Sequence, residues 1–571
     1  MKLASISIQN FRGIKTGSFF FPQESRLICL IGAGDSCKST FLKAIEWCFW
    51  PTWSLLVTDL DFHNCNTSSP IVIEASIAEM PQELLTEEKF GLFLRDYDAV
   101  VAGKENDEPV EGGKIVITVR LTINETLEPI WSVITNRSDP RPISHKDRSL
   151  FTLGVVGLDY EKDFVWGRTS VLQHYSESSQ DVLHTAYMQA MRTAVEKTDF
   201  SSLDQTTKNI KEIGKRYGVP FNGDLHNRLL MQNGRYSTAV GMFDDRVPLF
   251  LRGLGSKRLL SMGMNINVSK AGCLMLIDEL ETGLEPYRIC TLINQLRSDF
   301  KDKGQIIFTT HSESAICECE AEELFIMNMK DDSVSLFPLV EQDVRDEVQR
   351  LIRYEPHAFL CKRIIVCEGK TEIGLLKAFE TFIYRNTSSR FAYHGVGMAL
   401  GAGGDNLFKL TMLLYECGYD VCILMDSDVL REKNKKEECE KMGISVFSWA
   451  EGNAIEEEIF ADSNVDTVEE LIKLACRIKT LDHVIEKIKT LFPRASSLSD
   501  LQDLVIFVKS CSKDDFRKLG TIAKENKWFK QIASGQHVGD IVFNSYESMD
   551  ATNGFKRTMG LLYKWVNSDE T

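Results

Sequence analysis

The sequence has no long apolar run, no closely paired cysteines and no excess of positive charge. No stretch approaches the ~18 uninterrupted apolar residues of a membrane span. Gln9, Asn10 and Arg12 interrupt the amino-terminal stretch where a secretion signal needs an apolar core. The 14 prolines and 37 glycines are too few for a collagenous or low-complexity protein, and the 15 cysteines form no C-x-x-C pair. These absences predict a cytoplasmic protein whose thiols are reduced.

What is present is ordinary for a globular protein. The 571 residues are 43% hydrophobic and 26% charged, and this length predicts three or four domains. The net charge of −16 excludes a dedicated nucleic-acid coat protein. It does not exclude an enzyme that acts on nucleic acid, because such an enzyme needs only a local basic groove.

Strand and helix patterns divide the chain into four parts. Residues 1–164 combine buried strand runs with a helix that Pro51 ends, and 165–235 lack strand runs and predict amphipathic helices. The α/β pattern continues over 236–345. After a boundary near Pro356, a second α/β unit fills 356–571.

A phosphate-binding loop follows the apolar run 26–31 and opens a helix. The loop matches G-x-x-x-x-G-K-[ST] except that Cys37 replaces the second glycine. Lys38 is expected to neutralise the β- and γ-phosphates, and Ser39 to bind Mg²⁺. The alternative is a glycine-rich turn with a chance lysine. A side chain at position 37 is expected to strain the loop by about 1–3 kcal/mol, so hydrolysis could slow while binding survives. The predicted nucleotide contacts in this loop are Gly32, Gly34, Asp35, Ser36, Cys37, Lys38, Ser39 and Thr40.

Two later strands end in residues that would complete a nucleotide site. The apolar run 274–277 leads into Asp278 and Glu279, a Walker B pattern in which the first carboxylate holds Mg²⁺ and the second orients the attacking water. The run 306–308 leads through two threonines to His311, which is placed to sense the γ-phosphate. The alternatives are a buried strand with an acidic end and a structural histidine.

Carboxylates also follow two strands of the second α/β unit. The segment 363–372 reads RIIVCEGKTE and places Glu368 and Glu372 around a glycine turn, and Asp426 and Asp428 follow the run 421–425. Carboxylates at the carboxyl ends of neighbouring parallel strands share one crevice, and oxygen ligands suit Mg²⁺ or Mn²⁺. Two such ions could stabilise the attacking and the leaving oxygen when a phosphodiester bond is cleaved. The alternative is a structural α/β domain with acidic loop tips.

These motifs resemble two known families. The phosphate loop, Walker B strand and His311, with the opening segment 8–14, resemble ABC-type ATPases of the SMC, RecF and OLD (overcoming lysogenization defect) kind. Gly255 and Ser256 resemble the signature motif of that superfamily, which implies that the loop of one subunit closes on the ATP of another. The ordered set of E-G-x-T-E, a glycine-rich strand exit and D-x-D resembles a Toprim domain.

An ABC-type head followed by a Toprim domain is the layout of OLD-family nucleases, which include Gabija-type and retron-associated defence nucleases. The resemblance implies an α/β fold with a helical dimerisation insert, bound ATP with one Mg²⁺, and two Mg²⁺ or Mn²⁺ ions at the Toprim site. It implies DNA as substrate, a homo-oligomer (a dimer or dimer of dimers), an anti-phage role, and a helicase or a retron reverse transcriptase as partner.

The resemblance also suggests a third acidic element and a basic residue. Glu456 is the first choice in the run 456–458, whose register the sequence leaves open. Lys530, in a W-F-K context, would stabilise charge on the phosphoryl group, with Lys556 and Arg557 as competitors. The mixed-charge run 433–438 predicts a solvated helix face.

The expected function is therefore an ATP-binding, metal-dependent DNA endonuclease. The alternative is an SMC- or RecF-like DNA clamp whose Toprim site does not cleave. A topoisomerase is disfavoured because no separate domain with a nucleophilic tyrosine is evident. A primase is disfavoured because it would usually bring a zinc module, which the cysteine spacing does not provide.

Overall fold

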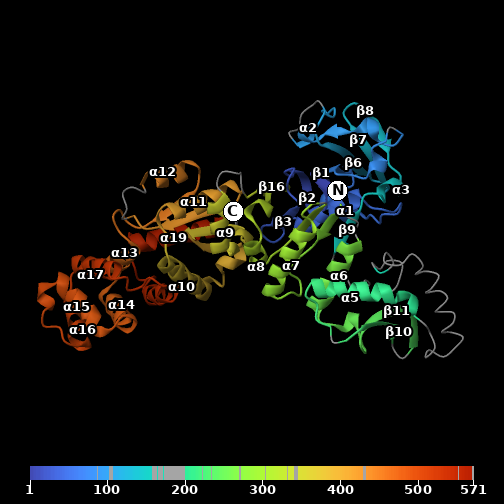
Figure 1. Cartoon of the computed structure of the whole chain (residues 1–571). Coiled ribbons are helices and arrows are strands. Elements are labelled where there is room, and N and C mark those ends of the chain that lie inside the picture. Colours follow the sequence, from blue (N-terminus) through green and yellow to red (C-terminus); the bar gives the residue numbers. More distant parts are fainter. Residues whose placement is uncertain are drawn as a thin grey trace. The chain divides into compact units, whose positions relative to one another are not determined.

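The computed structural model describes residues 1–568 except 87, 102–106, 157–163, 165–171, 173–199, 222, 233–234, 269–271, 303, 331, 340–344, 428–432 and 551. Two compact units divide the chain, Met1–Arg353 and Tyr354–Thr571 (Figure 1). The division falls at the boundary region expected near Pro356. None of the described helices has the length and apolar character needed to traverse a lipid bilayer.

The first unit is built on a mixed sheet of 13 strands in the order β8-β7-β6-β4-β1-β2-β16-β15-β3-β14-β13-β9, with β5 beside β6. The strands are β1 (Lys2–Phe11), β2 (Ile14–Phe20), β3 (Leu27–Ile31), β4 (Ile71–Ala78), β5 (Arg95–Asp96), β6 (Ile115–Ile123), β7 (Pro129–Thr135), β8 (Ser138–Pro142), β9 (Leu153–Val156), β13 (Leu274–Ile277), β14 (Gln305–Thr309), β15 (Leu324–Lys330) and β16 (Ser333–Pro338). The β15-β3-β14-β13-β9 part is parallel, so the carboxyl ends of these strands meet at one edge.

The apolar runs of the sequence explain this sheet. Every residue of β3, β13 and β14 is buried, as expected for strands covered on both faces. Helix α1 (Lys38–Cys48) packs its buried Phe41, Leu42 and Ile45 into the core that β1, β4 and β6 share. The strands predicted at 26–31, 274–277 and 306–308 and the helix that follows the phosphate loop are confirmed.

The remaining elements of the first unit are helices and a small sheet. The helices are α2 (Tyr97–Val101), α3 (His145–Arg148), α5 (Asp204–Arg216), α6 (Leu254–Val268), α7 (Pro286–Asp299), α8 (Glu313–Glu318) and α9 (Arg345–Tyr354). The small antiparallel sheet contains β10 (Leu225–Gln232), β11 (Arg235–Asp244) and β12 (Val247–Pro248).

This small sheet corrects part of the expected helical insert at 165–235. The insert holds α5, but its end, from Leu225 onward, is strand β10 and the start of β11. The next segment of the chain decides this difference. It forms β11, which pairs with β10 along nearly its whole length and so favours a strand over the expected helix. Most of the remaining insert lies outside the described residues, and its role in dimerisation stays a prediction.

The second unit contains a parallel sheet of four strands in the order β18-β17-β19-β20. The strands are β17 (Arg363–Cys367), β18 (Val396–Leu400), β19 (Asp420–Met425) and β20 (Ser445–Ser448). Strand β17 lies in the middle, and the chain passes first to β18 on one side and then to β19 on the other. In open parallel sheets such a reversal of strand order creates a crevice at the carboxyl ends of the strands.

Ten helices of the second unit are described: α10 (Lys370–Thr387), α11 (Gly404–Glu416), α12 (Lys433–Lys441), α13 (Ile455–Asp462), α14 (Val465–Ile478), α15 (Leu481–Leu491), α16 (Leu501–Lys509), α17 (Lys513–Glu525), α18 (Ile532–Phe543) and α19 (Gly554–Val566). Helices α10 and α18 pack backbone to backbone, since a Cβ on Gly535 would lie 2.5 Å from the carbonyl oxygen of Thr371. The Thr371 hydroxyl donates to the carbonyl oxygen of Phe529 (3.2 Å), so the turn before α18 is held against the start of α10.

Candidate functional site

The phosphate loop connects the buried strand β3 to α1, as the sequence predicts. Gly32 has a φ of +136°, and a Cβ there would lie 2.4 Å from the carbonyl oxygen of Met327. The Lys38 ammonium donates to the carbonyl oxygens of Gly32 (3.0 Å) and Ala33 (2.8 Å) and to the Ser36 hydroxyl (3.1 Å). Burial lowers the pKa of Lys38 to about 8. The loop therefore already holds a cation at the place where phosphate oxygens would be bound.

Cys37 is accommodated by a neighbouring glycine. Its backbone is left-handed (φ 65°), a conformation that favours glycine, which explains why glycine is usual at this position. The sulfur lies against Gly13, where a Cβ would come within 2.7 Å of it, and contacts the Met329 sulfur at 3.7 Å. Burial raises the pKa of the Cys37 thiol, so it stays protonated at neutral pH.

Cys37→Gly is expected to leave ATP affinity within about threefold of wild type, because the backbone stays in the conformation that glycine prefers. ATP turnover should stay equal or rise as the strained side chain is removed. Titration calorimetry and phosphate release measure the two quantities. A large loss of affinity would show that the sulfur itself supports the loop.

The two residues predicted to hold Mg²⁺ beside ATP lie next to each other. The Ser39 hydroxyl donates to Oδ1 of Asp278 (3.0 Å), although the residues are 239 positions apart. The Thr309 hydroxyl donates to the same oxygen (2.6 Å). Thr309 also accepts a hydrogen bond from the backbone N–H of Glu279 (2.8 Å), whose φ is 48°. Thr309, which the sequence analysis did not single out, therefore positions the Asp278 carboxylate and the backbone of Glu279.

His311 is held by a carboxylate that sequence reasoning missed. Glu281 accepts hydrogen bonds from the His311 backbone N–H (2.6 Å) and the Thr310 hydroxyl (2.6 Å). The imidazole is exposed, as a γ-phosphate sensor requires. The available signal was a third carboxylate two residues after Glu279, on the turn that follows Walker B.

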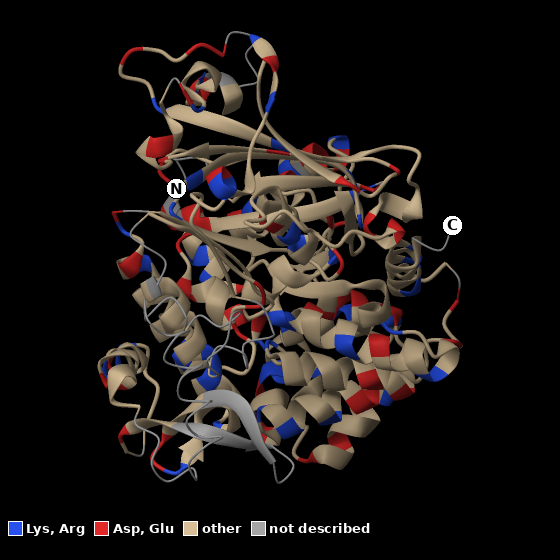
Figure 2. Ribbon diagram, turned by 90° about the vertical axis from the view of Figure 1, so that its right-hand side faces the viewer, with Lys and Arg blue, Asp and Glu red and all other residues tan. Residues whose placement is uncertain are grey.

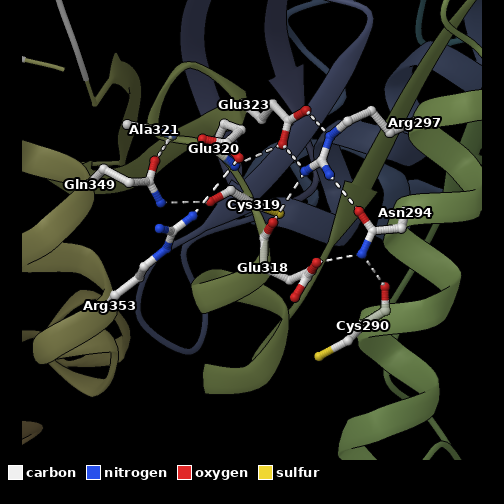
Figure 3. A network of polar contacts seen from close by, with 10 residues as sticks. All are labelled: Cys290, Asn294, Arg297, Glu318, Cys319, Glu320, Ala321, Glu323, Gln349 and Arg353. Carbon is white, nitrogen blue, oxygen red and sulfur yellow. Dashed lines mark hydrogen bonds and ion pairs between the residues drawn. The ribbon is translucent and has the colours of Figure 1, made fainter. Parts of the chain in front are cut away.

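The segment after His311 is fixed to the last helix of the first unit (Figure 3). The Gln349 side chain on α9 donates to the carbonyl oxygen of Cys319 (3.1 Å) and accepts from the N–H of Ala321 (2.7 Å). On the opposite side, Arg297 of α7 forms a salt bridge with Glu323 (2.7 Å). The segment between α8 and β15 is thus connected to both α7 and α9.

Gly255 and Ser256 lie at the start of α6, against the turn that follows Walker B. A Cβ on Gly255 would lie 2.4 Å from the carbonyl oxygen of Gly283. The fully buried Arg258 donates to the carbonyl oxygens of Asp278 (2.5 Å) and Glu279 (2.7 Å). The signature segment is therefore built onto the Walker B turn through Arg258.

The remaining predicted contacts of the phosphate loop lie near its surface. Gly34, Asp35 and Ser39 are exposed, and Thr40 is half-buried.

The carboxylates of the second unit meet at the crevice between β17 and β19. Glu368 follows β17 and accepts a hydrogen bond from the backbone N–H of Asp426 (2.7 Å), which follows β19. Asp426 accepts from the N–H of Ile455 at the start of α13 (2.9 Å). Glu372 on α10 and Glu456 on α13 are each only 2% exposed. The four predicted carboxylates therefore come together, and Asp428 lies outside the described residues.

Lys530 is the cation that reaches this carboxylate cluster (Glu368, Glu372, Asp426 and Glu456). Its ammonium lies 3.3 Å from Oε1 of Glu456. Burial lowers the pKa of Lys530, but Glu456, Glu372 and Asp426 outweigh that effect and leave the pKa raised. Its competitor Lys556 instead donates to the carbonyl oxygens of Glu547 and Met549.

The structure also distinguishes the three consecutive glutamates. Glu456 joins the carboxylate cluster, whereas Glu457 accepts from the Thr521 hydroxyl (2.8 Å) and pairs with Lys524 (3.2 Å). Glu458 accepts from the side chain of Asn453 (2.6 Å).

The charged run at 433–438 forms the start of helix α12. In this run Lys435 pairs with Asp405, and Lys436 donates to the Ser448 hydroxyl.

Burial and mutual repulsion make two carboxylates of this cluster harder to ionise. Burial, together with the neighbouring Glu456, raises the pKa of Glu372 to about 7. Burial, Glu372 and Glu368 raise the pKa of Asp426 well above its usual range. Within the described residues, Oε2 of Glu372 and Oε2 of Glu456 accept no hydrogen bond.

These properties fit a divalent cation that prefers oxygen ligands. Glu368 and Asp426 would hold one ion, and Glu372 with Glu456 a second. In the part of the chain that the structure describes, no three His, Cys, Asp or Glu side chains already stand in ligating positions, so the side chains would have to turn toward the ion.

The melting temperature of the metal-free protein is expected to fall as pH rises between about 4.5 and 7. Glu372 has a pKa of about 7 when folded and 4.5 as a free side chain, so the folded state prefers its neutral form and loses stability as the carboxyl ionises. Glu372→Gln should make the melting temperature depend less on pH in this range. Glu457→Gln is the control, because that carboxylate already has partners. An unchanged slope in Glu372→Gln would contradict the assignment.

The comparisons with known proteins concern the first unit. Residues 172–318 match the family described as "AAA domain, putative AbiEii toxin, Type IV TA system". The first unit contains an ATPase domain. This agrees with the phosphate loop, the Walker B strand and the Ser39–Asp278 contact, and it confirms the expectation of an ATP-binding unit at this level. No curated protein matches the chain.

Solved structures with some similarity are heads of SMC proteins. One is an Smc head bound to the C-winged helix domain of ScpA (12% identity, TM-score 0.37, covering 59% of this chain and 98% of that chain). Another is an Smc head with an extended coiled coil bound to the C-terminal domain of ScpA, from Pyrococcus furiosus (12%, 0.37, 59% and 95%). A third is the SMC head domain from Thermotoga maritima (14%, 0.31, 60% and 100%). TM-scores this low do not establish a shared fold.

Proposed function

We propose that the chain is an ATP-controlled, divalent-metal-dependent DNA endonuclease of the OLD kind, with a Toprim nuclease site in its second unit. The observation that supports this most is the carboxylate cluster, which gathers four acidic side chains from β17, α10, β19 and α13 beside Lys530. Buried carboxylates whose pKa values are raised and whose oxygens lack donors are characteristic of a site that binds cations.

Each residue has a role in this proposal. Glu368 and Asp426, with Asp428 from the sequence, hold the first metal ion, and Glu372 and Glu456 hold the second. When bound, Mg²⁺ or Mn²⁺ lowers the pKa of water and neutralises charge on the phosphodiester. Lys530, which pairs with Glu456 in the metal-free protein, would donate a hydrogen bond to the phosphoryl oxygens as their charge grows.

The ATPase unit would control this activity. Lys38 binds the phosphates of ATP, Ser39 and Asp278 hold its Mg²⁺, and Glu279 orients the attacking water. His311, positioned by Glu281, contacts the γ-phosphate. A homo-oligomer in which Gly255 and Ser256 of one copy close on the ATP of another, and a role in anti-phage defence, belong to the same proposal. The comparisons give no support for a helicase or reverse-transcriptase partner.

Nicking of supercoiled plasmid tests the proposal. The protein should convert supercoiled DNA to nicked or linear forms in Mg²⁺ or Mn²⁺, and EDTA should stop the reaction. Parallel reactions without nucleotide, with ATP and with a non-hydrolysable analogue establish the direction of ATP control. Absence of nicking under every metal and nucleotide condition would favour a DNA clamp.

Lys530→Ala is expected to lower the rate of nicking by about 10²–10³-fold, the usual cost of removing one donor to transition-state charge. Metal binding should not weaken, because lysine is not a ligand and Glu456 loses its competing cation. Lys556→Ala is the matched control, since Lys556 was the rival candidate and contacts backbone carbonyls instead. Equal rates for Lys530→Ala and wild type would remove Lys530 from the mechanism.

A further inference from the structure

The segment 513–530 is basic in an acidic protein. It carries six lysines and arginines against three acidic residues, in a chain of net charge −16. Figure 2 shows basic and acidic residues interspersed along the ribbons. Most of this segment is helix α17, and the rest is the turn that leads to Lys530. A local excess of positive charge therefore adjoins a residue of the proposed nuclease site.

Helix α17 lies directly against the helix that carries Glu456. A Cβ on Gly520 would lie 2.7 Å from the Cα atom of Glu457 and 2.8 Å from the carbonyl oxygen of Glu456. This contact is possible only because residue 520 has no side chain. Figure 1 shows α17 next to α13. The position of α17 relative to the carboxylate cluster is therefore fixed by backbone contact.

Hydrogen bonds also connect α17 to the turn after β19 that carries Asp426. Arg517 donates to Oδ1 of Asn453 (3.0 Å). The backbone carbonyl oxygen of Asn453 accepts from the N–H of Ser427 (3.0 Å), the residue after Asp426. Arg517 thus adjoins one side of the carboxylate cluster, and Lys530 adjoins another.

Apart from the exposed Lys513 at the start of α17, the cations of this segment fall into two classes. Lys524 and Lys530 pair with the glutamates of α13. Arg517, Lys518 and Lys527 are exposed. Within the described residues, Lys518 and Lys527 have no ion-pair partner, and the contact of Arg517 is to a neutral amide. These three side chains, which we call the α17 basic surface, present positive charge to the solvent, where an external anion can reach it.

We propose that the α17 basic surface binds the sugar–phosphate backbone of DNA beside the carboxylate cluster. This inference rests on the proposed function and names the surface that would hold its substrate. A cluster of buried carboxylates repels a polyanion, so the affinity for DNA must come from neighbouring cations. Contacts to phosphates fix the position of the duplex without reading its sequence. From residue 517 to 525 the helix extends about 12 Å, which corresponds to about three nucleotides of one strand.

The test is DNA binding by the full-length protein in EDTA, where no cleavage can occur. A fluorescein-labelled 30-base-pair duplex is titrated, and anisotropy is measured at several salt concentrations. The variant carries Arg517→Gln, Lys518→Gln and Lys527→Gln, which removes three positive charges and keeps polar side chains. The matched control carries Lys479→Gln, Lys487→Gln and Lys489→Gln, which removes the same charge from α14 and α15. Circular dichroism confirms that both variants fold.

The α17 variant is expected to lower the slope of log K against log salt by about 3, since each lost phosphate contact removes about one unit. Its affinity at low salt should fall at least tenfold, and the control should stay within about threefold of wild type. An α17 variant with the wild-type slope would overturn the inference, as would an equal loss in the control.

Plasmid nicking by the wild-type protein separates this inference from the proposed function. If wild type nicks DNA and the α17 variant binds DNA normally, the inference fails and the nuclease stands. If the α17 variant loses binding and wild type never nicks, the surface stands and the nuclease fails.

Discussion

Asp426→Asn should abolish metal-dependent nicking while leaving ATP binding unchanged. The pKa of Asp426 is raised well above its usual range, so the metal-free protein already holds a neutral side chain there. Asparagine reproduces that shape and can still accept the hydrogen bond from the N–H of Ile455. It cannot supply the negative charge that a divalent ion requires. Loss of a ligand should exceed the roughly 10²–10³-fold effect of losing one transition-state donor.

The measurement is plasmid nicking by wild type and Asp426→Asn purified side by side, with ATP binding followed by calorimetry. Asp482→Asn, at the exposed start of α15, is the matched control and should nick normally. Equal nicking by wild type and Asp426→Asn would place the activity elsewhere or in a contaminant. Loss of ATP binding in Asp426→Asn would point to general misfolding.

Lys38→Ala should remove detectable ATP binding. The Lys38 ammonium now satisfies three loop acceptors, and phosphate oxygens would take their place. Two hydrogen bonds between an ammonium and a phosphate contribute about 3–6 kcal/mol, so the affinity should fall by about 10²–10⁴-fold. Lys43→Ala, on the same helix but paired with Glu46, is the control and should bind ATP normally.

DNA binding in EDTA without nucleotide should be the same for Lys38→Ala and wild type, because Lys38 lies in the first unit. Tight ATP binding by Lys38→Ala would mean that the loop between β3 and α1 is not the nucleotide site. If Lys43→Ala lost affinity equally, the effect would come from α1 as a whole.

The sequence predicted those strands and site residues that depend on a short stretch of consecutive residues. Apolar runs predict β3, β13, β14, β17 and β19, because strands covered on both faces must be apolar throughout. The carboxylates that follow β17 and β19 then share a crevice because parallel strands bring their carboxyl ends together.

Other features depend on contacts that the sequence does not encode locally. Thr309 and Glu281 bond to residues about 30 positions away, and no spacing in the sequence identifies those partners. The register of the three glutamates follows from where α13 begins and from Gly520 of α17, which brings Thr521 and Lys524 to Glu457. Strand β10 has an amphipathic pattern that resembles a helix until its pairing with β11 is known.

Because Gly13 and Cys37 are in contact, we expect the residues at these two positions to change together among related proteins. The sulfur occupies the space that a Cβ at position 13 would need, because the two would be 2.7 Å apart. We expect relatives with glycine at position 37 to tolerate alanine or serine at position 13, and relatives with cysteine at position 37 to require glycine at position 13. The turn between β1 and β2 and the phosphate loop should therefore covary in an alignment, and Gly13→Ala should be better tolerated together with Cys37→Gly than alone.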